Sequence, residues 1–281
     1  AAATNLTEYG RYGYKGMLYH YYVWSDGAAE FRADPGVEVS SIDTVLLMYG
    51  LLVCAQYFGE PVATNYAQAR DKIAWTNWLD RASPGNSNQF YMSYMTNTGL
   101  AGHWDWRSDE TALICVFAAM SDTNLDERAI WNAWTRDSVT YTSPSPTSET
   151  FTCYASWNGD PFTDFYGLAF VDTGRFPPDF NGVDWFDNNR ISYRGHVEHF
   201  KKERAYLDNM TFAFVAGAIN PIAKPKSDGA SPAVRTDCSL YSLAGGLPFY
   251  SSALESNEIA QTLSSLVTNS PGSSLFDWHG W

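Results

Sequence analysis

Apolar residues along most of this chain recur at every third or fourth position, which is the spacing of one face of an α-helix. The clearest segment is 41–58, where a long apolar run ends at Gly59 and Pro61. Segment 108–120 is apolar on nearly every side, as expected of a helix buried within a protein. Further helices are predicted over 64–79, 126–139, 184–207 and 212–220, and weaker ones over 239–245 and 251–269.

The segments between these helices are irregular and aromatic, and few of them alternate apolar and polar residues as strands do. Roughly seven or eight helices with hardly any strand predict an all-α fold, with a site built from the loops at one face. Residues 1–13 are predicted to form a flexible N-terminal segment, and 14–281 a single helical domain.

The composition of the chain indicates which class of ligand it is suited to bind. The chain has 281 residues, of which 45% are hydrophobic, enough to bury a sizeable core. Its formal charge of −13 opposes binding to nucleic-acid phosphates and anionic lipid, so we expect a neutral partner. Aromatic residues make up 16% of the chain and supply flat amphipathic rings, which serve as core filler and as platforms for ligands such as sugars.

Two features bear on where the protein works. The start "AAATNLTEYG" resembles a mature end left after a signal peptide is removed, so a secreted or extracellular location is expected, with the periplasm as the alternative. Cys153 and Cys238 lie in irregular polar segments and are the better candidates for a disulfide in an oxidising compartment. No run of about 18 apolar residues is present, so no membrane span is predicted.

The segment "EVSSID" places two acids at the entrance to the apolar helix over 41–58. Ser40 stands three residues before Asp43, so Ser40 is predicted to cap the helix while Asp43 reaches back from the first turn, where the helix dipole favours an acid. Glu38 precedes the cap, and local structure does not account for it. Glu38 is therefore either a solvated loop acid or a functional one. Glu38 and Asp43 are expected to have different roles.

The segment "GLAGHWDWRSDETALICVFAAM" gathers acids before a wholly apolar helix. An apolar wall raises the pKa of a nearby carboxyl, as a general acid at neutral pH requires. Glu110 is the best placed for that role, whereas Asp109 is also explained as a helix cap. The pair His196 and His199 is better explained as part of a solvated, charged helix than as a metal site. No metal or cofactor is predicted.

Four blocks in this order, "YKGMLYHYYVW", "EVSSIDTVLLMYGLLVCAQYF", "HWDWRSDETALICVFAAM" and "DWFDNNRISYRGHVEHFKKERAYLDN", resemble the glycoamylase-like family of glycoside hydrolases, which includes endo-β-1,2-glucanases. The resemblance covers most of 14–281 and implies an (α/α)6 toroid. The predicted helices fall short of a complete toroid, so the chain is expected to begin and end inside that fold. A second chain or another copy of this one is expected to cover the aromatic end "FDWHGW".

Carried over residue by residue, the resemblance implies that Glu110 is the general acid and that Glu38 is the other carboxylate of the cleft. It also implies that sugar subsites are lined by Tyr19, His20, Asp43, Trp104, Trp106, Asp109, Asp184, Arg190 and Asp208. The chain departs from its relatives at Ser108-Asp109, which adds a charge beside Glu110, and at Met210, where a proline is usual.

The resemblance thus implies an endo-acting glycoside hydrolase that cleaves a β-glucan with inversion, and β-1,2-glucan is the first expected substrate. The alternative is a non-catalytic extracellular protein, derived from this fold, that binds carbohydrate or assembles with itself. A polysaccharide or oligosaccharide is the expected partner under either interpretation.

Overall fold

The computed structural model describes residues 13–24, 31–33, 36–142, 148–156, 161–203 and 247–249. The chain divides into two compact units, Ala1–Thr135 and Arg136–Trp281. The predicted flexible segment 1–13 lies outside the described residues except for Gly13, and the single domain over 14–281 stays a prediction.

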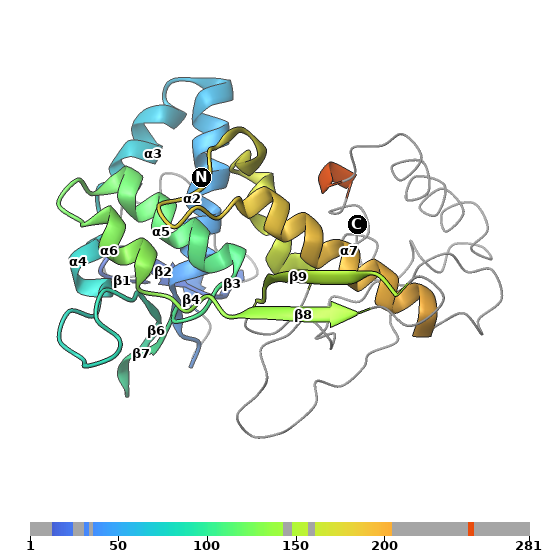
Figure 1. Ribbon diagram of the computed structural model, residues 1–281. Helices are drawn as coiled ribbons and strands as arrows, with labels where there is room; N and C mark the ends of the chain where they lie inside the picture. The colour runs from blue at the N-terminus through green and yellow to red at the C-terminus, as the bar shows by residue number, and fades with distance from the viewer. Residues whose placement is uncertain are drawn as a thin grey trace. The chain divides into compact units, whose positions relative to one another are not determined.

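The first unit contains a five-stranded antiparallel sheet (Figure 1). Its strands, in spatial order, are β1 (Gly13–Tyr14), β2 (Met17–Tyr19), β5 (Val39–Ser40), β6 (Tyr91–Met95) and β7 (Gly99–His103). A separate two-stranded sheet pairs β3 (Tyr22–Trp24) with β4 (Phe31–Ala33). Strand β5 passes directly into a helix, so the sheet sets the position at which that helix begins.

The described part of the first unit also contains the helices α2 (Ser41–Phe58), α3 (Val62–Arg70), α4 (Trp75–Trp78), α5 (Asp109–Ser121) and α6 (Glu127–Asn132). Helix α2 has the bounds that the apolar pattern predicted, and α5 lies within one residue of its prediction. The buried faces of α2 and α5 form the core together with aromatic residues of α4. The residues of this core include Val45, Met48, Tyr49, Trp75, Trp78, Leu113, Ile114 and Phe117.

Helices α2 and α5 pack side by side and run in the same direction. The Tyr49 hydroxyl donates to the Leu113 carbonyl at 3.3 Å, and the Tyr49 ring meets the Phe117 ring edge-on at 5.1 Å. Tyr49 and Phe117 stand equally far from the starts of their helices. The Trp104 indole, five residues before α5, also donates to Ser41 at the first position of α2, so the two N-termini, with the acids of both first turns, lie at the same end of the helix pair.

The second unit combines a β-hairpin with a long helix (Figure 1). Strand β8 (Ser138–Thr142) pairs with β9 (Thr150–Tyr154), and α7 (Trp185–Glu203) packs on β9. The Asn188 side chain accepts from the Tyr154 backbone N–H at 2.7 Å and donates to its carbonyl at 3.3 Å. Four short 3-10 turns accompany them: η1 (Pro161–Asp164), η2 (Tyr166–Ala169), η3 (Thr173–Arg175) and η4 (Leu247–Phe249).

The prediction of an all-α fold, and with it the all-α toroid, is wrong. Within the described residues a five-stranded sheet and two further strand pairs accompany six α-helices. The strands are two to five residues long, too short for the alternation of apolar and polar residues to stand out against an aromatic background. Antiparallel pairing makes these strands, in hairpins such as β6–β7 and between distant segments such as β5 and β6.

Two predicted helices are also shorter than expected. The helix over 64–79 is divided into α3 and α4, with a break after Arg70, and the helix over 126–139 ends at Asn132 because Ser138 already begins β8. The helices predicted over 212–220, 239–245 and 251–269 lie outside the described residues.

By length and composition alone, α2 could cross a membrane. In the structure it instead contacts α3, α5 and strands of the sheet, and it buries Val45, Met48 and Tyr49 against them. These contacts are those of a core helix in a folded unit. The absence of a membrane span stays a prediction.

Candidate functional site

The register of the first sheet brings His20 and Glu38 together. Strands β2 and β5 are antiparallel, and Tyr19 pairs with Val39. The next position of this ladder sets His20 opposite Glu38, and the His20 backbone N–H donates to the Glu38 carbonyl at 2.9 Å. Side chains at opposed positions of an antiparallel pair point to the same face. The His20 Nδ1 consequently lies 2.9 Å from Glu38 Oε1.

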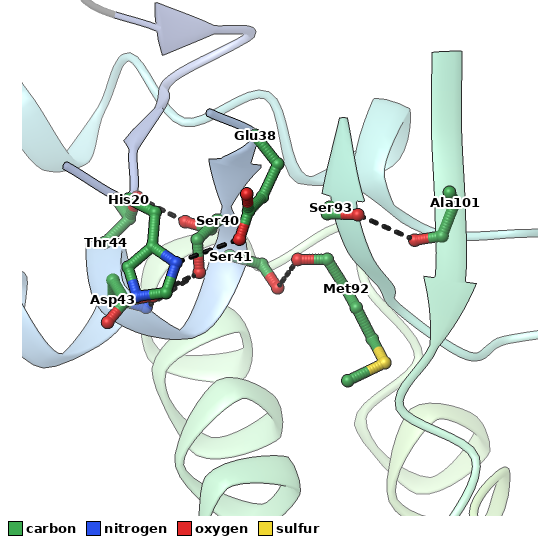
Figure 2. A network of polar contacts seen from close by, with 9 residues as sticks. All are labelled: His20, Glu38, Ser40, Ser41, Asp43, Thr44, Met92, Ser93 and Ala101. Atoms are coloured by element: carbon green, nitrogen blue, oxygen red, sulfur yellow. Dashed lines mark hydrogen bonds and ion pairs between the residues drawn. The ribbon is translucent and has the colours of Figure 1, made fainter. Parts of the chain in front are cut away.

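Asp43 reaches the same imidazole from helix α2 (Figure 2). Its Oδ2 lies 3.4 Å from His20 Nε2, so each ring nitrogen faces a carboxylate. A protonated imidazole donates to both carboxylates, whereas a neutral one has a single N–H and donates to one. His20, Glu38 and Asp43 are called the carboxylate cluster below. The side chains of Glu38 and Asp43 remain 37% and 38% exposed, which leaves lone pairs open to a ligand.

Ser40 holds Asp43 in place. As predicted, Ser40 is the N-cap of α2, and its hydroxyl oxygen accepts from the Asp43 backbone N–H at 3.4 Å. The same hydroxyl donates to the Asp43 carboxylate, which is therefore fixed over the first turn. The Thr44 hydroxyl donates to the Ser40 carbonyl at 2.7 Å and accepts from the Leu18 backbone N–H at 2.8 Å, which ties the helix start to β2.

The His20 imidazole keeps Glu38 ionised. Its hydrogen bond to the Glu38 side chain is the main reason that the pKa of this carboxyl lies below its usual value, and a hydrogen bond to the Glu38 backbone acts in the same direction. Partial burial opposes them more weakly. An ionised carboxylate suits a base or a hydrogen-bond acceptor, and it does not suit a proton donor.

Trp104 connects the carboxylate cluster to the segment that carries Glu110. The Trp104 indole N–H donates to the Ser41 hydroxyl at 2.9 Å, and this hydroxyl donates to the Met92 carbonyl at 2.9 Å (Figure 2 shows the Ser41–Met92 contact). Ser41 is the first residue of α2, directly beside Ser40. Trp104 is buried, so it supports the site from behind.

Backbone hydrogen bonds fix the path from Trp104 to α5. The Thr135 N–H donates to the Asp105 carbonyl at 2.8 Å, and the Arg107 N–H donates to the Thr135 carbonyl at 3.0 Å. The Trp106 carbonyl accepts from the Thr111 hydroxyl at 2.8 Å. These bonds fix the segment between Trp104 and the start of α5.

At the start of α5 the acids have separate surroundings. Ser108, and not Asp109, is the N-cap, because its hydroxyl accepts from the Thr111 N–H at 3.1 Å. Asp109 is buried, and its carboxylate lies 3.8 Å from the guanidinium of Arg107, which is 1% exposed. Arg107 compensates the charge of Asp109. Glu110 is partly exposed in the first turn, and it is the more accessible of the two acids.

The remaining predicted site residues either make other contacts or lie outside the described residues. Tyr19 ends β2, and its backbone N–H donates to the Tyr22 hydroxyl at 3.0 Å. In the second unit Asp184 accepts from the Asp187 N–H at 2.9 Å and so caps α7, and Arg190 forms an ion pair with Asp187. Asp208 lies outside the described residues, as does Cys238, the predicted disulfide partner of the buried Cys153.

Two residues of the site were not predicted. Tyr21 stacks on His20, with ring centroids 4.0 Å apart and planes 14° from parallel, and Ser41 receives the Trp104 indole. The run "YHYY" is a signal for the first, but only the sheet register tells which of its rings face the acids. Among the described residues, no group of three or more His, Cys, Asp or Glu side chains is arranged to hold a metal ion.

Comparison with solved structures finds the same fold in carbohydrate-active proteins. The endo-β-1,2-glucanase of Chitinophaga pinensis, in complex with sophorotriose and glucose, superposes with a TM-score of 0.61 at 14% identity, over 94% of this chain and 64% of its own. A glucoamylase-like protein of Bacteroides uniformis has a TM-score of 0.62 at 14% identity, over 95% of this chain and 64% of its own. A similar protein of Bacteroides fragilis has a TM-score of 0.59 at 17% identity, over 95% of this chain and 64% of its own.

These similarities show the fold, and they confirm the resemblance drawn from the four sequence blocks. The chain spans about 64% of the length of these neighbours. No family model matches the sequence. No curated protein matches it either.

Proposed function

We propose that this protein hydrolyses a β-glucan, with Glu110 as the general acid and Glu38 as the ionised carboxylate that completes the pair. The observation that carries the proposal is the Ser41–Trp104 hydrogen bond, which fastens the segment of Glu110 to the helix start beside Glu38 and Asp43. The parallel packing of α2 and α5 supports it, because it sets the first-turn acids at one end of the helix pair.

The two acids suit different steps of glycoside hydrolysis. Glu110 would protonate the glycosidic oxygen as the bond to the anomeric carbon breaks, and its partner must take a proton from the attacking water in an inverting reaction. Glu38 is suited to the second step, since His20 stabilises its ionised form. Asp43, fixed by Ser40, would accept hydrogen bonds from sugar hydroxyls.

The choice of β-1,2-glucan rests on the structural neighbour. One protein with which this chain shares its fold, over 94% of its residues, is an endo-β-1,2-glucanase bound to sophorotriose and glucose. Internal cleavage of β-1,2-glucan is accordingly the activity to test first. Secretion, and a second chain or copy that covers the aromatic C-terminal end, remain predictions from the sequence.

Replacement of Glu110 by Gln tests this assignment. The amide keeps the shape of the side chain but has no proton to give, so the release of reducing ends from β-1,2-glucan should fall by about 10²–10⁴-fold. Glu127→Gln is the matched control, since Glu127 is also a first-turn glutamate but is exposed on α6. Equal rates for Glu110→Gln and the wild type would refute the role of Glu110.

The second candidate is a carbohydrate-binding protein without hydrolytic activity. It is favoured by one feature of the carboxylate cluster: Glu38 and Asp43 each face a nitrogen of His20, an arrangement that suits binding of hydroxyls as well as proton transfer. In that case sophorotriose binds to the wild type, and no reducing ends appear over a long incubation.

A further inference from the structure

The outward face of helix α2 is exposed and yet carries no charge beyond its first turn. Leu47 and Val53 are 41% and 57% exposed, and Tyr57 and Phe58, in the last turn, are 81% and 65% exposed. The helix has no charged residue after Asp43. A surface helix ordinarily places charged residues on the side away from the core, whereas a helix that is apolar all round is covered on every side.

Gly50 lies at the centre of this face. Leu46, Leu47, Val53 and Cys54 are three or four residues away from it, and residues at that spacing are neighbours on one side of a helix. A glycine inside a helix lowers its stability relative to alanine. No packing among the described residues requires this glycine, because a Cβ built on it would meet none of their atoms within 4 Å. Gly50 therefore leaves room for another backbone to approach the middle of the face.

These features suit a second copy of the chain. Gly50 lies midway along α2, so two antiparallel α2 helices that cross at Gly50 bring Leu47 of each copy opposite Val53 of the other. The chain has a formal charge of −13, and two copies repel each other where their acidic surfaces meet. They approach with the least repulsion through a face that is uncharged over most of its length.

The apolar area of this face is of the size that a stable dimer uses. At about 150–250 Å² for a large side chain, the exposed fractions of Leu47, Val53, Tyr57 and Phe58 amount to roughly 350–600 Å² in each copy. A standard interface buries about 800 Å² on each partner, of which somewhat more than half is apolar. Exposed apolar patches of a few hundred Å² on a soluble protein mark interaction sites.

We propose that this protein forms a homodimer in which the α2 helices of two copies pack antiparallel across a two-fold axis at Gly50. The glycine allows the two helix backbones to approach closely, and Leu47, Val53 and Tyr57 of both copies fill the space around the contact. This inference does not depend on the proposed function. Its surface is also distinct from the aromatic C-terminal end for which a covering partner was predicted.

Sedimentation velocity over a range of protein concentrations tests the dimer. The wild type should shift from the mass of one chain toward twice that mass as the concentration rises. Val53→Glu should raise the Kd of the dimer about 100-fold or more, because it buries a carboxylate against Leu47 of the other copy. Phe176→Glu is the matched control, since it adds the same charge at a 62% exposed phenylalanine in the second unit, and it should dimerise like the wild type.

Gly50→Ala is a second test, in which folding and dimerisation change in opposite directions. At a concentration at which the wild type is monomeric, alanine should raise the melting temperature by about 2 °C, because it favours the helix. The added Cβ keeps two crossing helices apart, so the Kd of the dimer should rise about tenfold. A glycine without a role in assembly would give the first effect and not the second.

Three results would overturn the proposal. The first is a wild type that stays monomeric at every concentration. The second is a dimer that Val53→Glu and Gly50→Ala leave intact, because it would use another surface. The third is a monomer that binds phosphatidylcholine vesicles and loses this binding in Val53→Glu, because the face would then contact lipid. Each of these results leaves the assignment of Glu110 and Glu38 unchanged.

Discussion

Two carboxylate–imidazole groups in the first unit use the same chemistry in different surroundings. In the carboxylate cluster, His20 lies between Glu38 and Asp43, which are 37% and 38% exposed. In the second group His103, at the end of β7, lies 3.1 Å from the carboxylate of Asp80, which is 3% exposed. The two groups should therefore respond in opposite ways when their acids are replaced.

Asp80 is fully engaged in holding its own loop. One carboxylate oxygen accepts from the backbone N–H groups of Ala82 and Ser83, at 2.9 and 3.0 Å. The other accepts from the Tyr91 hydroxyl at 3.0 Å and faces His103. Hydrogen bonds from Ser83 and its neighbours hold the pKa of Asp80 far below its usual range. An acid beside a histidine thus indicates function only where lone pairs remain accessible to a ligand.

The largest expected difference between the two groups is in catalytic activity. Glu38→Gln should lower kcat/KM for β-1,2-glucan by about 10²-fold or more, because the amide cannot take a proton. Its melting temperature should stay close to that of the wild type, since Glu38 is more than a third exposed. The measurement is a reducing-end assay together with a thermal melt. A large loss of stability with full specific activity would show that Glu38, like Asp80, has a structural role and not a catalytic one.

The reverse result is expected for Asp80→Ala. Removal of this carboxylate leaves several donors in the loop and hairpin without their acceptor, so thermal stability should fall more than in any other variant of the two groups. The activity per folded molecule should be retained. Because the folded-state pKa of Asp80 is lowered, its stabilisation is present above the usual aspartate pKa and is lost as the pH falls below it. Melts at several pH values test this.

An intermediate effect is expected for His20→Gln. Without the imidazole the pKa of Glu38 rises toward its usual value, so the acid limb of the pH–rate profile should move to higher pH. Loss of the fixed geometry should also lower kcat/KM by about tenfold. His103→Gln is the control, because it removes an imidazole from the other group. An acid limb that stays in place would show that Glu38 does not set it.

The smallest effect is expected for Tyr91→Phe. It removes one hydrogen bond to the Asp80 carboxylate and should cost about 1–2 kcal/mol of unfolding free energy, measured by urea denaturation. Tyr94→Phe is the control, since the Tyr94 ring stacks on Tyr14 at 3.6 Å and the substitution keeps that ring. A reduced kcat in Tyr91→Phe would mean that the Asp80 group also takes part in the reaction.

Local sequence determined the elements whose signals lie within one segment. Helix α2 and its cap at Ser40 follow from an apolar run that is preceded by a serine and ended by a glycine, and α5 follows from the same logic at Ser108. The positions of Asp43 and Glu110 in the first turns of these helices could therefore be predicted from the sequence. The prediction of a neutral ligand likewise rests on charge and composition alone.

Tertiary structure decided which of these residues meet. His20 faces Glu38 because β2 and β5 pair in one particular register, and strands of two or three residues carry too little pattern to reveal that pairing. Trp104 meets Ser41 because α2 and α5 pack in parallel. Pairing of short strands, in hairpins and between distant segments, likewise formed sheets where an all-α fold was expected. Contacts between distant segments depend on the packing of the whole unit, and local periodicity does not encode them.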